Sequence, residues 1–156
     1  MELLPVLTGA PLRRESRYSY DCRACRRCCH DKRIPLGPYE LARLAHHLGT
    51  DTSTVIRRYT VDGGVALQAR EDGSCVFLGP EGCRVHADRP LACRLYPLGR
   101  VVREGREEFI RLAPHPESEG VTGDRGTVLD WLHAQGVWPY LAAAERYRAV
   151  LGRLVE

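Results

Sequence analysis

Four cysteines lie within eight residues near the start of the chain, in the stretch DCRACRRCCHDKR: Cys22, Cys25, Cys28 and Cys29. The C-x2-C-x2-C spacing lets successive sulfurs converge on one metal centre while the loop amides turn towards them. Cys28 and Cys29 are adjacent, so a disulfide between them would need a strained ring. The segment is polar and rich in arginine, which argues against four inert thiols in a buried core strand. The spacing therefore predicts metal ligation.

Three further cysteines, Cys75, Cys83 and Cys93, bring the count to seven. An odd count fits poorly with a closed disulfide framework. The N-terminal stretch MELLPVLTGAPLRRE has no basic leader before its short apolar run, and no apolar run is long enough to span a bilayer. We therefore expect a cytoplasmic protein without a membrane partner, whose thiols stay reduced and bind metal ions.

The charge pattern supports a metal centre better than a nucleic-acid interface. The formal net charge is +3, and seven thiolates would change it to −4 before any metal is counted. A zinc-stabilised nucleic-acid-binding module would need a basic stripe with interleaved aromatics, whereas only 7% of the residues are aromatic. The arginines that accompany the thiols can instead offset thiolate charge and lower thiol pKa values. They are Arg23, Arg26, Arg27, Arg84, Arg89 and Arg94.

Four helices are predicted from apolar periodicity and end signals. The first covers 38–48, with Pro38 in its first turn, Gly49 as its stop and Leu41, Leu44, Ala45 and Leu48 on one face. The others cover about 51–59, 127–134 and 138–154. The apolar stripe of the last helix is interpreted as core packing.

Two hairpins are predicted from alternating patterns around turn residues. One joins VALQAR to CVFL through Asp72-Gly73 and delivers Cys75, and the other turns at Glu104-Gly105 within RVVREGREEFIRLA. Residues 79–99 are expected to be mostly loop, and 113–126 to be broken by glycines and prolines. The 156 residues predict a small α+β protein. It has an irregular N-terminal arm at 1–20 and a single cysteine-cluster metal-binding domain at 21–156.

The two cysteine blocks carry a family resemblance. The run from Cys22 to Cys29 resembles the signature of the CxxCxxCC family of zinc- or iron-chelating domains, the YkgJ-type cysteine-cluster proteins. The block CVFLGPEGCRVHADRPLACRLYP is similar to the second cysteine block of that family, and PYELARLAHHLG and GTVLDWLHAQG fit its layout. The resemblance covers most of residues 20–150. It implies seven metal ligands: Cys22, Cys25, Cys28, Cys29, Cys75, Cys83 and Cys93.

One position departs from the family. Its members often have an eighth cysteine after the second hairpin, where this chain has APHPESEG. If that thiol completes a second site, another group must replace it here. The candidates are His115, Glu117, Glu119 and His86, which lies three residues after Cys83.

The spacing favours an iron–sulfur centre over zinc. C-x2-C-x2-C with a distant fourth cysteine is the run typical of ferredoxins, and we expect Cys93 to supply the fourth ligand of a [4Fe–4S] cluster. Structural zinc sites more often use two separated C-x2-C knuckles, which Cys75 and Cys83 do not form. Zinc stays open as the alternative metal.

The sequence therefore predicts a metal-binding cysteine-cluster protein whose biochemical role and protein partners it does not name. A cluster-dependent enzyme related to flagellin lysine methylases is an alternative that rests on a looser resemblance. No glycine-rich nucleotide fingerprint supports S-adenosylmethionine chemistry, and no catalytic residue stands out.

Overall fold

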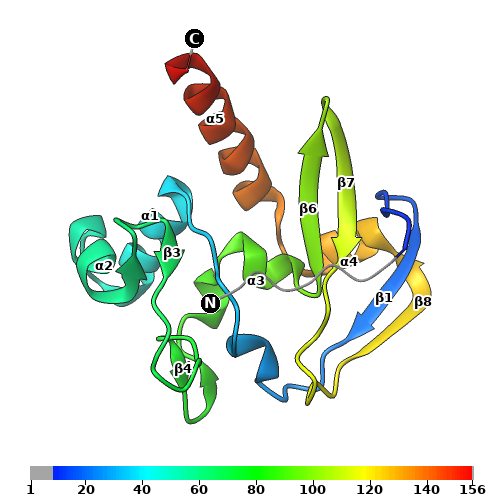
Figure 1. Cartoon of the computed structure of the whole chain (residues 1–156), viewed down its shortest axis with the longest axis horizontal. Coiled ribbons are helices and arrows are strands. Elements are labelled where there is room, and N and C mark those ends of the chain that lie inside the picture. Colours follow the sequence, from blue (N-terminus) through cyan, green and yellow to red (C-terminus); the bar gives the residue numbers. More distant parts are fainter. Residues whose placement is uncertain (1–8, 156) are drawn as a thin grey trace.

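The computed structural model describes residues 9–155 and confirms an α+β fold (Figure 1). Its α-helices are α1 Pro38–Leu48, α2 Thr52–Tyr59, α3 Leu91–Leu95, α4 Val128–Ala134 and α5 Trp138–Leu154. Two short 3-10 helices are η1 Arg27–Cys29 and η2 His86–Asp88. The strands are β1 Arg17–Asp21, β2 Thr60–Val61, β3 Ala66–Leu67, β4 Leu78–Gly79, β5 Gly82–Cys83, β6 Leu98–Arg103, β7 Arg106–Arg111 and β8 Val121–Thr127. They form four separate antiparallel pairs: β1–β8, β2–β3, β4–β5 and β6–β7.

The four helices predicted from periodicity are confirmed, since their end signals work as expected. At the start of α1 the Glu40 side chain accepts a hydrogen bond from the Gly37 amide (3.3 Å). The helix ends at Gly49, whose φ of 64° favours glycine. At the start of α2 the Asp51 carboxylate accepts from the Thr54 amide (2.7 Å).

The predicted hairpin at Glu104-Gly105 is also confirmed. Both turn residues have positive φ, 50° and 75°, as a tight two-residue hairpin turn requires. The pairing of β6 with β7 is regular, with Val101 opposite Glu108.

The hairpin predicted to deliver Cys75 forms only in part. A bridge pairs Ala69 with Cys75 around a turn in which Gly73 has a φ of +85°. Leu78, however, pairs with Cys83 in β4–β5. The predicted alternation is wrong at Val65, which is 52% exposed, because its neighbour Ala66 carries the buried side.

The pairing of β1 with β8 was not predicted. Residues 17–20 were expected to be irregular, yet they form β1 with Tyr18 buried at 2% exposure. The Tyr18 ring meets Trp131 edge to face at 6.1 Å, which anchors the strand. The partners lie about a hundred residues apart, so no local pattern reveals the pairing. Residues 1–8 of the predicted arm lie outside the described residues.

The buried side chains form two clusters. The first lies where β1, β6, β7 and α3 to α5 meet, and the second lies among α1, α2 and the segments at 67–85. Cys75, Cys83 and Cys93 pack against the second cluster. Within residues 9–155, no helix combines the length and hydrophobicity that crossing a membrane requires.

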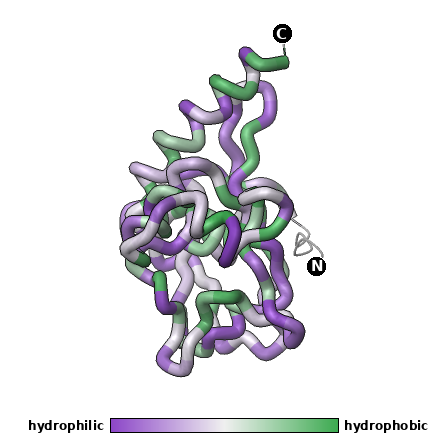
Figure 2. Tube along the Cα trace, turned by 90° about the vertical axis from the view of Figure 1, so that its left-hand side faces the viewer, coloured by the Kyte–Doolittle hydropathy of each residue, from purple (hydrophilic) through white to green (hydrophobic). Residues whose placement is uncertain are grey.

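The stripe on α5 packs only at its beginning. Tyr140 and Leu141 are buried, both at 5% exposure, whereas Tyr147, Leu151 and Leu154 are exposed. The helix projects beyond the rest of the chain beside the β6–β7 hairpin, and hydrophobic residues continue to its end (Figures 1 and 2). The core-packing prediction is therefore wrong for the second half of α5.

Candidate metal centre

A cavity of about 490 Å³ brings all seven cysteines to one surface. They come from three segments: the loop at 22–29, the turn at 75, and the stretch from 83 to 93. Cys22 is exposed, and the other six are partly buried. The cysteines that line this cavity are Cys22, Cys25, Cys28, Cys29, Cys75, Cys83 and Cys93.

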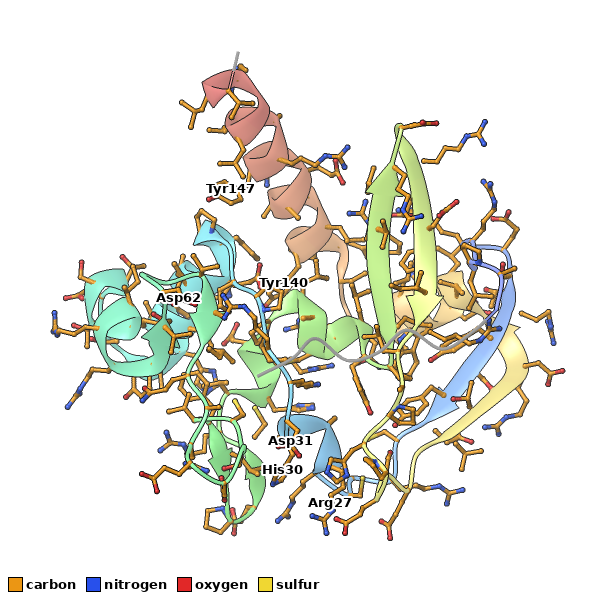
Figure 3. The ribbon with its side chains drawn as sticks, viewed as in Figure 1. Arg27, His30, Asp31, Asp62, Tyr140 and Tyr147 are labelled. Carbon is orange, nitrogen blue, oxygen red and sulfur yellow. The ribbon has the colours of Figure 1, made fainter. Side chains whose placement is uncertain are left out.

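The first loop leaves β1 and turns back tightly towards the second block. Ala24 and Arg26 adopt positive φ, 53° and 65°, just before η1. The Cys29 carbonyl accepts a hydrogen bond from the Cys75 amide (2.7 Å), and the Asp31 amide donates to the Gly73 carbonyl (3.0 Å). These bonds connect the two cysteine blocks through the backbone. Figure 3 shows Arg27, His30 and Asp31 together on this side of the molecule.

The remaining two cysteines are positioned by short elements. Cys83 ends β5, and Cys93 lies in α3, a one-turn helix within the stretch that was expected to be loop. The connection between them docks on α1 through Asp88, whose carboxylate accepts from Arg43 (2.6 Å) and bonds His47 (2.9 Å). This contact fixes the 83–93 segment against a regular helix.

The described side chains do not close around a single ion. Within residues 9–155, no group of three or more His, Cys, Asp or Glu side chains is arranged to hold one metal ion. The seven thiols instead line the wall of the cavity.

Cys28 and Cys29 form a coupled pair. The Cys29 thiol donates a hydrogen bond that lowers the pKa of Cys28 to about 6, and the Lys32 charge lowers it further. The same hydrogen bond and burial raise the pKa of Cys29. The hydrogen bond therefore shifts the pKa values of the two neighbouring thiols in opposite directions.

Burial dominates at the second block. It raises the pKa of Cys75 and Cys83, and it raises that of Cys93 to about 12. The Lys32 ammonium opposes this increase at Cys75 and Cys93, while the nearby Cys28 thiol adds to it at Cys75, Cys83 and Cys93. The two blocks are thus close enough to interact electrostatically. A bound cation would supply the charge that turns these buried thiols into thiolates.

The predicted basic partners divide into two groups. Arg23, Arg26 and Arg89 line the cavity, and Arg89 lies close enough to Cys93 and Cys83 that their charges raise its pKa against the larger effect of burial.

Arg27, Arg84 and Arg94 do not line the cavity. Arg27 pairs with Glu117 (3.2 Å), and Arg84 is exposed. The expectation that Arg94 balances the Cys93 thiolate is wrong. Its buried guanidinium donates to three backbone carbonyls, including that of Gln135 (3.0 Å), and to the Tyr140 hydroxyl.

The candidates for the missing eighth ligand also differ in whether they line the cavity. His86 lines the cavity, whereas His115, Glu117 and Glu119 do not. His115 pairs with Asp31 (3.4 Å), two residues after the first loop.

The sequence analysis did not identify several side chains that line the cavity. For Lys32 the only available signal is its position, three residues after Cys29. The same cavity is lined by Tyr20 of β1, by Tyr96, which follows α3, and by Trp131 of α4. The buried Tyr96 hydroxyl lies near the backbone of His115 without forming a hydrogen bond of ordinary geometry to any described residue.

Comparison with known proteins links the site to a family. The chain is 30% identical over 92 residues to a Methanocaldococcus jannaschii protein named "Uncharacterized protein MJ0661". The aligned residues are 56% of this chain and 50% of that protein. The chain thus spans about half the length of that relative. No solved structure gives a significant match. Residues 21–118 match CxxCxxCC, described as a "Putative zinc- or iron-chelating domain", and the chain therefore belongs to the CxxCxxCC family.

Proposed function

We propose that the seven-cysteine cavity holds an iron–sulfur centre of the [4Fe–4S] type. The observation that carries this proposal is that three separate segments bring seven thiols to one cavity of about 490 Å³. A single tetrahedral metal ion takes four ligands, so seven thiols exceed what one ion uses. A polynuclear cluster, alone or beside a second ion, uses them better.

The ligand assignment follows from spacing and proximity. Cys22, Cys25 and Cys28 supply the run that cysteine-ligated clusters favour. For the fourth ligand, from the second block, we propose Cys93, which lines the same cavity. Cys29 carries its own thiol next to Cys28 and is free to serve a different centre.

We propose a second, smaller site made of the remaining donors. Cys29, Cys75, Cys83 and the imidazole of His86 line the same cavity. Three thiolates and one imidazole form a ligand set typical of zinc. We propose this set as the replacement for the family's eight-cysteine pattern.

The surroundings suit an anionic cluster. Arg23, Arg26, Lys32 and Arg89 line the cavity and can offset the negative charge of several thiolates.

A bound [4Fe–4S] centre supplies one-electron transfer. The chain's own residues hold the centre, balance its charge and limit its contact with water. An enzymatic reaction that uses the centre, as in the flagellin lysine methylases, is a separate proposal. No side chain that lines this cavity favours it.

Metal and sulfide analysis after anaerobic purification tests the proposal. We expect brown protein with broad absorption near ~400 nm and iron and acid-labile sulfide in equal amounts, as cysteine-ligated clusters contain. A colourless anaerobic sample with stoichiometric zinc and no sulfide would exclude the iron–sulfur centre and leave a zinc-chelating domain.

A further inference from the structure

A second cavity, of about 570 Å³, lies between α5, the β6–β7 hairpin and the segment at 32–40. Its volume is within the range of small-molecule sites. Most of its wall is aliphatic, so a ligand with an apolar body fits it. The aliphatic wall includes Ile34, Leu36, Leu95, Ile110, Leu112 and Leu151.

The walls of this second cavity are tied to one another. Arg100 of β6 pairs with Glu145 of α5 (2.8 Å), which joins the hairpin to the helix. On the other side, Tyr147 reaches from α5 towards the start of α1 (Figure 3). The Tyr147 ring lies beside Gly37, because a methyl group added to that glycine would be 3.8 Å from the ring. Contacts on both sides therefore define the second cavity.

Positive charge predominates around this aliphatic wall. Among the described residues that line the cavity, Glu40 is the one acidic residue. Its carboxylate accepts a hydrogen bond from the Gly37 amide at the start of α1. The basic residues that line it are Lys32, Arg33, Arg100 and Arg148.

Two of these cations are already compensated. Arg33 pairs with Asp62 (3.0 Å), and Arg100 pairs with two glutamates. Across residues 9–155, Lys32 and Arg148 form no ion pair. The Lys32 ammonium lies 4.1 Å from the centre of the Tyr96 ring. Because the Lys32 charge acts on the thiols of the candidate metal centre, Arg148 carries the charge that an anionic group on a ligand would compensate.

We propose that the second cavity binds a small amphipathic anion, with an aliphatic body against the apolar wall and an acidic head group attracted by Arg148. Lys32, Ile34 and Tyr96 line both cavities. The ligand site therefore shares a wall with the candidate metal centre. The proposal rests on the second cavity alone and holds for either metal.

Calorimetric titration of the full-length, metal-loaded protein tests the proposal with decanoate as the probe. Decanol and decyltrimethylammonium, with the same chain length, serve as the neutral and cationic comparisons. We expect decanoate to saturate one site and to bind about tenfold more tightly than decanol, the size of one charge-assisted interaction. The cationic probe should bind more weakly than either.

Two alanines of α5 provide a matched pair of variants. Ala144 lines the second cavity, whereas Ala142 is exposed on the same helix and does not line it. Ala144→Trp should abolish decanoate binding, and Ala142→Trp should leave it within about twofold of the wild type. Arg148→Met should remove most of the preference for decanoate over decanol, while Arg33→Met, which removes a compensated cation, should not.

Several outcomes would overturn the proposal. They are no saturable binding of decanoate, equal binding of decanol and decanoate, or equal loss in the two tryptophan variants. Analytical ultracentrifugation of the same samples tests a further outcome that would overturn the proposal. A dimer that decanoate does not dissociate and that Ala144→Trp disrupts would assign the apolar face of α5 to a second copy of the chain instead.

Discussion

Glu40 is a carboxylic acid held largely out of water at the start of α1. Its burial raises the pKa from 4.5 to about 7, while hydrogen bonds from the Gly37 and Leu91 amides oppose that increase. The folded protein therefore keeps a proton that the unfolded chain loses between about pH 4.5 and pH 7. The contribution of Glu40 to stability is fully present below about pH 4.5 and is lost as the pH rises through 7.

Replacement of Glu40 by glutamine tests this linkage. Relative to Glu40→Gln, the free energy of unfolding of the wild type should fall by about 3 kcal/mol between pH 4.5 and 7.5, at ~1.4 kcal/mol per pKa unit. Denaturant titrations across this pH range measure the difference. Glu104→Gln, at the exposed hairpin turn, is the control and should not change the pH profile. Parallel profiles for the wild type and Glu40→Gln would contradict the account.

At the scale of single residues, the sequence predicted some side chains of the site and missed others. Every cysteine of the cavity could be predicted, because an odd number of thiols at metal-ligand spacing favours metal binding over a disulfide framework. The role of a neighbouring cation could not. Arg89 and Arg94 both accompany Cys93, yet Arg89 faces the cavity and Arg94 faces away from it. Lys32, which interacts with three of the thiols, has no sequence signal beyond its position close to Cys29.

At the scale of elements, Arg94 connects α3 to α5. Its guanidinium, in a residue only 7% exposed, donates to the carbonyls of Ala87, Arg89 and Gln135 and stacks on the Tyr140 ring at 4.2 Å. The short helix that carries Cys93 is too short to be stable alone. Its position in the fold depends on this contact.

Removal of the Arg94 contact should therefore destabilise the protein. Arg94→Met leaves three carbonyls without their donor and should lower the free energy of unfolding by about 3 kcal/mol or more. Arg84→Met is the matched control, since Arg84 follows Cys83 as Arg94 follows Cys93 but is exposed. Its effect should stay within ~0.5 kcal/mol. Similar losses in the two variants, measured by denaturant titration, would show that Arg94 is not a special anchor.

The elements that the sequence revealed are those with local signals. The helices α1, α2, α4 and α5 have periodic apolar residues and end signals, and the hairpin at 98–111 has a glycine turn. The β1–β8 pair depends on the burial of Tyr18 against Trp131, a contact between distant parts of the chain. Tertiary packing of this kind leaves no periodic pattern in Val121–Thr127.

At the scale of the whole molecule, the cysteine segments lie between two clusters of buried side chains. The loop at 22–29 leaves β1, which packs in the first cluster, while Cys75, Cys83 and Cys93 pack against the second. A metal centre bound by both sets of thiols would tie the two clusters together. Metal binding and folding should then be coupled.

Metal removal measures this coupling. The metal-free protein, prepared with a chelator under reducing conditions, should melt at least ~10 °C below the metal-loaded protein, as a loss of several kcal/mol implies for a chain of this size. Re-addition of the metal should restore the original melting temperature. An unchanged melting temperature after complete removal would mean that the fold does not depend on the centre.

The central claim is that both cysteine blocks supply ligands to the same cluster, and the metal content of Cys25→Ser and Cys93→Ser tests it most directly. Both variants should lose most of their metal per chain when purified anaerobically beside the wild type, because the loss of one thiolate ligand empties a site. Ala87→Ser, which adds a hydroxyl at an exposed position between Cys83 and Cys93, should retain it. Full occupancy in Cys93→Ser together with loss in Cys25→Ser would contradict the account, because the first loop would then complete its centre without the second block.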